Sequence, residues 1–386
     1  MAGRMSGISG EAAFETLARA NELERQGRSV VHLEIGEPDF DTPSPIVNAG
    51  VDWLKKGATH YAPVAGIWEL RQRIAGELSG RYPNKIDPST IIITPGAKMM
   101  IFSMILSVVD PGDEVIYPAP AYPAYEAAIR IAGATPVAVR LEESKGFRFD
   151  LDEVALKVTP RTKMFVINSP QNPTGGVLQL EDIQGLFKLA EEHDLLILSD
   201  EIYSKIFYAE RPASTLDVPG ILNRLLMVNG FSKTTAMTGW RLGYGVVPAD
   251  LFKAVELFVN TSVSSTATFT QLAGIEAFTE ETGVAVQSMV REFHKRRDVF
   301  VDGLNKIKGI RCLRPAGAFY LFPNVSGLGM SSKEVADRLL NEAGVACLPG
   351  TAFGDYGEGY LRFSFANSLS NIESALERIK TFVDNL

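Results

Sequence analysis

Residues 91–109 read Ile-Ile-Ile-Thr-Pro-Gly-Ala-Lys-Met-Met-Ile-Phe-Ser-Met-Ile-Leu-Ser-Val-Val. The three isoleucines form a short apolar run, which predicts a buried strand. Thr94-Pro95-Gly96 predicts a turn, and the apolar segment after it predicts a helix over residues 97–109. A strand that leads through a short turn into a helix is the building unit of α/β folds.

The same alternation continues through the middle of the chain. Helices are predicted over residues 125–132 and 180–193. Further strands are predicted over residues 114–117, 136–141, 163–168, 195–199, 224–229 and 241–247. Continuously apolar strands separated by helices indicate a mostly parallel sheet that is covered on both faces.

After Pro248 the pattern changes to long helical segments, over residues 249–278 and 283–306, followed by short elements. These are strands over residues 310–313, 319–322 and 360–365, and helices over residues 332–343 and 370–384. The first ~45 residues predict a helix and an extended arm. We therefore expect a large α/β domain over 47–280 and a smaller α+β domain built from both termini, 1–46 and 281–386.

Composition narrows the class of protein. The chain has 386 residues, 46% hydrophobic and 22% charged, and a net charge of −8 without a basic block, which argues against a nucleic-acid partner. No stretch approaches the ~18 apolar residues of a membrane span, and no signal-peptide pattern opens the chain, so a cytoplasmic location is expected. The two scattered cysteines, Cys312 and Cys347, suggest a reduced compartment, and no Cys or His spacing suggests a metal site.

The run Ser232-Lys233-Thr234-Thr235-Ala236-Met237-Thr238-Gly239-Trp240-Arg241 indicates a cofactor. A lysine in such a pocket can form a Schiff base with an aldehyde, and the nearby Ser232 and Arg241 can hold a phosphate. An aldehyde and a phosphate on one molecule predict pyridoxal phosphate (PLP). Taken alone, the run fits a surface lysine on a loop equally well.

The segment Leu198–Tyr203 places two carboxylates at the end of a predicted strand. Ligands of open α/β sheets bind at the carboxyl ends of strands, and a carboxylate buried there needs a partner. The pyridine nitrogen of PLP would be that partner, because a protonated nitrogen makes the ring an electron sink. We choose Asp200 over Glu201, since it is shorter and comes first, and Tyr203 could bond the ring hydroxyl. A helix N-cap beside a core tyrosine is the competing interpretation.

Two turns supply further candidates. Residues 168–176, Asn-Ser-Pro-Gln-Asn-Pro-Thr-Gly-Gly, form a rigid non-helical turn after a strand, from which Asn172 can donate to the ring hydroxyl oxygen. The turn at Gly96 opens a helix, and the free N–H groups there favour an anion. Lys98 in the first helical turn opposes the helix dipole, which is tolerable if a phosphate or a substrate carboxylate lies close by.

Period-two alternation in Tyr360–Phe365 puts Arg362 and Ser364 on the face opposite Leu361, Phe363 and Phe365. An arginine fork can hold a carboxylate with two hydrogen bonds. Arg362 is therefore the candidate for the α-carboxylate of an amino acid, with a salt bridge on a solvated sheet face as the alternative.

In this order, these segments resemble the class I/II aminotransferases of the fold-type I PLP enzymes, from Gly36 to Arg362. The runs Gly36-Glu37-Pro38-Asp39-Phe40-Asp41-Thr42-Pro43 and Gly96-Ala97-Lys98 are similar to the bacterial subgroup of aspartate and aromatic or prephenate aminotransferases. The resemblance implies a homodimer with shared sites, in which Tyr61 reaches the phosphate bound by the neighbouring subunit.

The resemblance also implies individual roles. Lys233 would carry pyridoxal 5'-phosphate as a covalent aldimine and would move the proton. Further cofactor contacts would come from Gly96, Ala97, Lys98, Tyr122, Asn172, Asp200, Tyr203, Ser232 and Arg241. Substrate contacts would come from Gly36, Lys98, Tyr122, Asn172 and Arg362.

Two departures bear on the substrate. Close relatives often carry tryptophan where this chain has the ring-stacking Tyr122, and residues 260–266 lack the arginine that the animal-type aspartate enzymes use for the distal carboxylate. In the bacterial subgroup, the lysine matching Lys98 is implied to take that role. We therefore expect aspartate or glutamate as donor and a 2-oxo acid such as 2-oxoglutarate as acceptor, in a ping-pong cycle.

Other functions remain open at this point. An aromatic- or alanine-type aminotransferase, a β C–S lyase or a cyclising γ-eliminase would use the same scaffold. A nicotinamide-dependent oxidoreductase is disfavoured because Gly243-Tyr244-Gly245 lacks the third glycine and a following helix. The intact set of Lys233, Asp200 and Arg241 argues against a non-catalytic regulatory protein.

Overall fold

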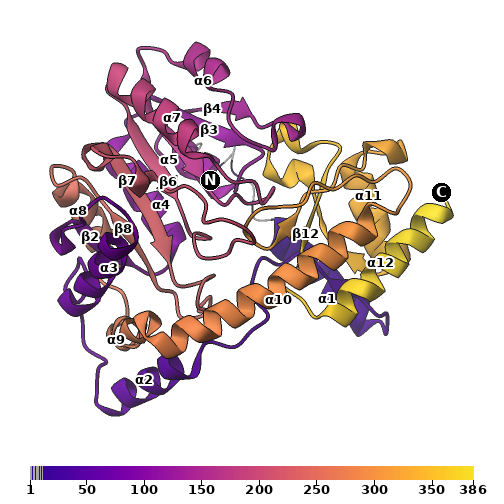
Figure 1. The fold of residues 1–386 in the computed structure, drawn as a ribbon, viewed down its shortest axis with the longest axis horizontal. Helices are drawn as coiled ribbons and strands as arrows, with labels where there is room; N and C mark the ends of the chain where they lie inside the picture. Colours follow the sequence, from indigo (N-terminus) through magenta and orange to yellow (C-terminus); the bar gives the residue numbers. More distant parts are fainter. Residues whose placement is uncertain (1, 3–4, 6–7, 9, 11) are drawn as a thin grey trace.

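The computed structural model describes residues 2, 5, 8, 10 and 12–386, and its largest element is a seven-stranded sheet (Figure 1). Neighbouring strands are parallel except at β8, which is antiparallel to both of its neighbours, so the prediction of a mostly parallel sheet is confirmed. In order across the sheet, the strands are β2 (Ile91–Thr94), β8 (Gly243–Val246), β7 (Leu225–Gly230), β6 (Leu196–Asp200), β5 (Thr162–Asn168), β3 (Glu114–Ala119) and β4 (Thr135–Arg140).

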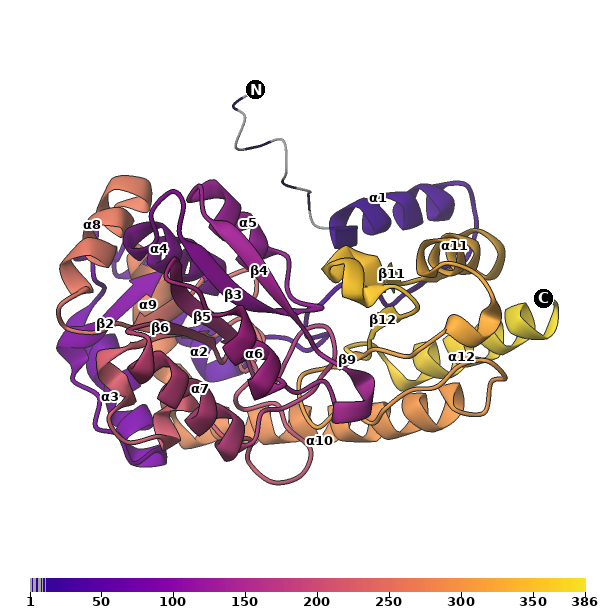
Figure 2. The same cartoon turned by 90° about the horizontal axis from the view of Figure 1, so that it is seen from above.

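Successive side chains of the central strands enter two different cores. Ile197 and Leu225 belong to one apolar cluster, whereas Leu198 and Leu226 belong to another, as the alternation along a strand requires. Both faces are covered, with α5 and α8 on one side of the sheet and α7 on the other in Figure 2. The helices of this part are α2 (Ser44–Lys55), α3 (Trp68–Arg81), α4 (Ala97–Val108), α5 (Ala124–Ile131), α6 (Leu151–Lys157), α7 (Leu180–Glu192), α8 (Phe252–Val263) and α9 (Thr268–Gly274).

The second part of the molecule has its own core and two small sheets. β11 (Leu348–Pro349), β12 (Leu361–Ser364) and β9 (Tyr320–Leu321) are antiparallel, and β1 (Val31–His32) pairs with β10 (Val345–Ala346). The long helix α10 begins beside α2 and ends beside α12, as Figure 1 shows. The helices of this part are α1 (Ala12–Arg25), α10 (Glu280–Leu304), α11 (Ser332–Arg338) and α12 (Leu369–Asp384). Residues 1, 3, 4, 6, 7, 9 and 11 of the predicted small domain lie outside the described residues.

Two predicted elements differ in the structure. The helix predicted over 249–278 is broken between α8 and α9, where Ser264 adopts a positive φ of 62°. Serine and threonine compete with helical hydrogen bonds through their side chains, which explains why the run 264–266 interrupts the helix. The strand predicted over 310–313 is reduced to a single bridge between Arg311 and Asn324. The side chain of Asn305 bonds both the N–H and the C=O of Cys312, so these groups are not available to a sheet.

Candidate active site

A cavity of about 550 Å³ lies at the carboxyl ends of β5 and β6, where the two parts of the molecule meet. This is the expected place for a ligand in an open α/β sheet. Tyr61 is 90% exposed and lies outside this cavity. Gly96 is the N-cap residue of α4 and is not among the residues that line the cavity. Of the predicted site residues, the lining contains Gly36, Ala97, Lys98, Tyr122, Asn172, Asp200, Tyr203, Ser232, Lys233, Arg241 and Arg362.

Asp200 is the last residue of β6 and is 3% exposed. One carboxylate oxygen accepts a hydrogen bond from the hydroxyl of Tyr125 at 2.8 Å, and the other accepts from the N–H of Ile202 at 3.1 Å. Burial dominates over these bonds and raises the pKa of Asp200 to about 6. A buried carboxylate of this kind would be stabilised by a cation, and a protonated pyridine nitrogen meets that need.

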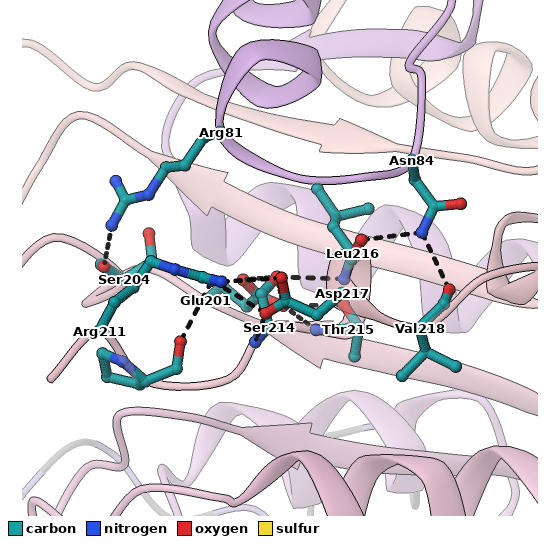
Figure 3. A network of polar contacts seen from close by, with 11 residues as sticks. Arg81, Asn84, Glu201, Ser204, Arg211, Ser214, Thr215, Leu216, Asp217 and Val218 are labelled. Atoms are coloured by element: carbon teal, nitrogen blue, oxygen red, sulfur yellow. Dashed lines mark hydrogen bonds and ion pairs between the residues drawn. The ribbon is translucent and has the colours of Figure 1, made fainter.

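Glu201, the neighbouring carboxylate, lies beside the hydroxyl groups of Ser214 and Thr215 (Figure 3). It accepts from the hydroxyls of Ser199 at 3.2 Å, Ser214 at 2.7 Å and Thr215 at 2.8 Å, and from the N–H of Thr215 at 3.0 Å. These bonds attach the segment 214–218 to the end of β6. Glu201 directly follows the end of β6, and successive residues of an extended chain point to opposite sides, which is why Asp200 and not Glu201 lines the cavity.

Lys233 follows β7 and is half-buried, with its Nζ 2.6 Å from the carbonyl oxygen of Gly36, to which it donates. Gly36 belongs to the arm that connects β1 to α2. The amine is thereby held at the boundary between the two parts of the molecule. It shares the cavity with Asp200.

The beginning of α4, together with Arg241, forms a cradle for an anion. Gly96 has a φ of +88°, and a Cβ at this position would collide with the guanidinium of Arg241. A Cβ at Gly243 would collide with the backbone of Gly96 and Ala97. The two glycines therefore let strand, helix start and arginine approach closely, and the N–H groups in the first turn of a helix suit a phosphate. The chain thus offers a fitting place for both ends of a PLP molecule.

The turn that carries Asn172 is tied directly to the strand ends. The side chain of Asn168 donates to the carbonyl of Asp200 at 2.9 Å and accepts from the N–H of Asn172 at 2.9 Å. Gln171 donates to the carbonyl of Pro120 at 3.0 Å. Because these groups are buried, the turn is fixed from within.

Arg362 lies on β12 and is 4% exposed. It donates to the side-chain oxygen of Asn172 at 3.3 Å and to the carbonyl of Glu34. Its guanidinium lies 4.6 Å from the ring centroid of Tyr320 and 4.9 Å from that of Phe353. Aromatic surfaces on the guanidinium limit its movement and leave it directed at the cavity.

The wall and the rim of the cavity contain residues that the sequence did not single out. Tyr125 contacts Asp200, and Tyr320 contacts Arg362. The cavity lining also includes Ala13 and Phe14 of α1 and Glu37 of the arm. Glu37 accepts a hydrogen bond from Thr238. The Nζ of Lys98 lies 5.7 Å from the ring centroid of Tyr122. Tyr125 lies in the first turn of α5, three residues after the predicted site residue Tyr122, and this closeness in the sequence was the available signal for Tyr125. Nothing local in the sequence marks Tyr320.

Within the described part of the chain, no group of three or more His, Cys, Asp or Glu side chains is arranged to hold a metal ion. None of the helices described is long and apolar enough to cross a membrane. Gly243 and Gly245, the glycines of the nicotinamide alternative, lie within strand β8 rather than before a helix.

A lysine, a buried carboxylate and an arginine thus line one cavity. The fold and this site are those of a class of transferases that one protein family defines. The family profile "Aminotransferase class I and II" matches residues 28–379, and the chain belongs to this family. It is an aminotransferase, and enzymes of this family depend on PLP and act on amino acids and 2-oxo acids.

Individual relatives cover almost the whole chain. The chain is 40% identical to an aspartate aminotransferase of Pyrococcus horikoshii, over 95% of this chain and 93% of the relative. It is 41% identical to a probable aspartate/prephenate aminotransferase of Thermus aquaticus, over 97% of each chain. Among solved structures, the aspartate aminotransferase from Thermus thermophilus with maleate is 39% identical and superimposes with a TM-score of 0.95, covering 100% of this chain and 99% of that one. The predicted family and fold type are thereby confirmed.

Proposed function

We propose that this aminotransferase carries PLP on Lys233 and moves the amino group of L-aspartate or L-glutamate to a 2-oxo acid such as 2-oxoglutarate. The observation that carries the proposal is the convergence of Lys233, Asp200 and Arg362 on one cavity. The names of the relatives, which include aspartate aminotransferases, support an acidic donor.

The cofactor would be held at three places. Asp200 would pair with the pyridine nitrogen, Tyr203 and Asn172 would bond the ring hydroxyl, and Tyr122 would stack on the ring. Its phosphate would lie in the cradle at residues 96–98, with Ser232 and Arg241. When bound, PLP supplies an electron sink for the electrons of the substrate Cα–H bond.

The side chains of this protein would do the rest. Arg362 would hold the α-carboxylate with two charge-assisted hydrogen bonds and so fix the orientation of Cα. The Nζ of Lys233 would take the proton from Cα and deliver it to the cofactor carbon, with the carbonyl of Gly36 2.6 Å away as its hydrogen-bond acceptor. Lys98 at the rim would take the distal carboxylate of the donor.

A second substrate class is favoured by one observation. Ala13 and Phe14 line the same cavity as Lys98, and the side chain of Phe14 is an apolar surface that is 63% exposed. An aromatic donor could bury its ring against Phe14, since exposed aromatic surface gains from contact with a second ring. The Thermus aquaticus relative bears both aspartate and prephenate in its name.

We also propose that the chain divides into two units, residues 47–280 and residues 1–46 with 281–386, and that the protein is cytoplasmic.

We further propose that the protein is a homodimer. α2 exposes Val47, Val51 and Leu54, which are four and three residues apart and therefore share one helix face. Tyr61 lies just beyond this helix and is 90% exposed. An exposed apolar stripe of this kind suits a subunit contact, from which Tyr61 would reach the partner's phosphate site.

The proposal is tested by the absorption spectrum of the PLP-loaded protein, with and without L-aspartate and without any 2-oxo acid. We expect a visible band that disappears on addition of L-aspartate, because the amino group passes to the cofactor. Lys233→Ala should fold but lack this band and turnover. L-Phenylalanine in place of L-aspartate tests the aromatic alternative.

A visible band that no donor changes would remove the transamination chemistry proposed here, and a band that survives in Lys233→Ala would remove Lys233 from it. Loss of the band with L-phenylalanine but not with L-aspartate would exclude the acidic donor and leave Lys98 without the role given to it.

A further inference from the structure

Tyr320 lies between two residues of the proposed site, Arg362 and Tyr203. It begins β9, where it stands opposite Ser364 of β12 and is 1% exposed. Arg362 is two residues before Ser364, so Tyr320 and Arg362 are diagonal neighbours on the same face of the sheet. This register explains how the ring of Tyr320 comes to lie 4.6 Å from the guanidinium of Arg362.

The hydroxyl of Tyr320 points to the second of these residues, Tyr203. It lies 2.8 Å from the hydroxyl of Tyr203, and the two rings meet edge to face at 5.8 Å. A Cβ at Gly36 would collide with the Tyr320 hydroxyl, so the glycine lets the arm approach it. The same Gly36 accepts the hydrogen bond of Lys233.

Tyr203 has only one proton to donate. Burial, followed by the proximity of Tyr320, holds the pKa of Tyr203 well above its usual value, so this phenol stays protonated. When Tyr203 donates to the ring oxygen of the cofactor, its own oxygen is left to accept from Tyr320. A hydroxyl that accepts one hydrogen bond becomes a better donor in the next.

We propose that Tyr320 is a positioning residue that couples the carboxylate-binding Arg362 to the phenol of Tyr203. The inference rests on the proposed function, because it presupposes PLP beside Tyr203. The ring of Tyr320 fixes Arg362 for the substrate, and its hydroxyl orients Tyr203 for the cofactor. One side chain therefore acts on substrate affinity and on cofactor electronics through two separable parts.

Two substitutions separate these parts. Tyr320→Phe keeps the ring under Arg362 and removes the hydroxyl, whereas Tyr320→Leu removes both. For Tyr320→Phe we expect the pH midpoint of the visible band to move upward, since Tyr203 then stabilises the ring oxyanion less well. The KM for L-aspartate should stay within about twofold, because the cation–π contact remains. For Tyr320→Leu the KM should rise about five- to thirtyfold, the loss expected for such a contact in a desolvated site.

Tyr117→Phe is the matched control. Tyr117 is a buried phenol on β3 that donates to Glu126 at 3.0 Å and lies outside the cavity lining. Its loss should leave both the band midpoint and the KM unchanged. Thermal unfolding of the PLP-free variants reports any general loss of packing separately from these two readouts.

The outcomes distinguish the inference from the function on which it rests. If wild type forms the visible band and responds to L-aspartate, but Tyr320→Phe titrates like wild type, the coupling does not exist and Tyr320 is a packing residue. If Tyr320→Leu does not fold, the Phe variant alone decides. If wild type itself forms no band with PLP, it is the proposed function that fails.

Discussion

Asp200 and Glu201 are adjacent in the chain, yet their carboxylates have different surroundings. Glu201 accepts from four donor groups, the hydroxyls of Ser199, Ser214 and Thr215 and the N–H of Thr215, whereas Asp200 accepts from one tyrosine hydroxyl and one backbone N–H. The carboxylate with fewer donors is the one that faces the cavity. Its charge is therefore costly in the PLP-free protein and is available to a cationic ligand.

Asp200→Asn should stabilise the PLP-free protein and weaken PLP binding. The folded-state pKa of about 6 lies above the ordinary value of 3.8 for an aspartate, so the folded state binds the proton more tightly between these pH values. Wild-type stability should then fall as pH rises from 4 through 6, by at most roughly 3 kcal/mol, while the Asn variant lacks this loss. Denaturant unfolding at pH 5 and pH 8 should show a larger advantage for the variant at pH 8. An equal difference at both values would mean that Asp200 does not titrate in this range.

At the scale of elements, α10 fixes the arm that carries Gly36. Arg296 of α10 is 6% exposed and bonds Asp39 at 2.7 Å and Glu292 at 3.2 Å. Its guanidinium lies 5.0 Å from the ring of Phe40, which packs edge to face on Phe293 at 5.4 Å. The arm is thus held three and four residues after Gly36, whose carbonyl accepts from Lys233.

Arg296→Met should lower the free energy of unfolding by about 1–3 kcal/mol, because a buried charged donor is lost while Asp39 is partly screened by solvent. The KM for L-aspartate should rise as well, since the arm at Gly36 loses its anchor. Lys295→Met, an exposed change on the same helix, serves as the control. Denaturant unfolding and steady-state kinetics give the two values. A stability loss with an unchanged KM would show that the anchor does not act on the site.

At the scale of the whole molecule, the apolar stripe of α2 and the exposed Tyr61 suggest that the site is completed by a second copy of the chain. Val51→Glu places a charge in the middle of that stripe. We expect it to shift the protein from dimer to monomer in light scattering coupled to gel filtration, because a buried unpaired charge is costly. Leu156→Glu on α6, at a position 87% exposed, should leave the dimer intact. A Val51→Glu protein that stays dimeric would place the contact on another face.

The order of most strands and helices and the mostly parallel sheet followed from local patterns. Apolar runs, turns at strand ends and period-two alternation are encoded within a few residues, so Asp200, Lys233 and Arg362 could be proposed as site residues before the fold was known, whereas other candidates came from the family resemblance. The antiparallel β8, the break after Val263 and the missing strand at Cys312 were not visible in this way. Each depends on a distant or competing hydrogen-bond partner, such as Asn305 for Cys312.

The sequence by itself determined the family and the class of reaction, and it indicated the candidate residues for the two charged ends of the proposed site, because these depend on residue types in a fixed order. Only the tertiary structure decided that Tyr125 bonds Asp200, that Glu201 faces away, and that Tyr320 joins Tyr203 to Arg362. These contacts join segments that are 75 to 117 residues apart along the chain or face each other across a sheet register. No local pattern encodes such pairs, since they form only when packing of the two cores brings the strand ends together.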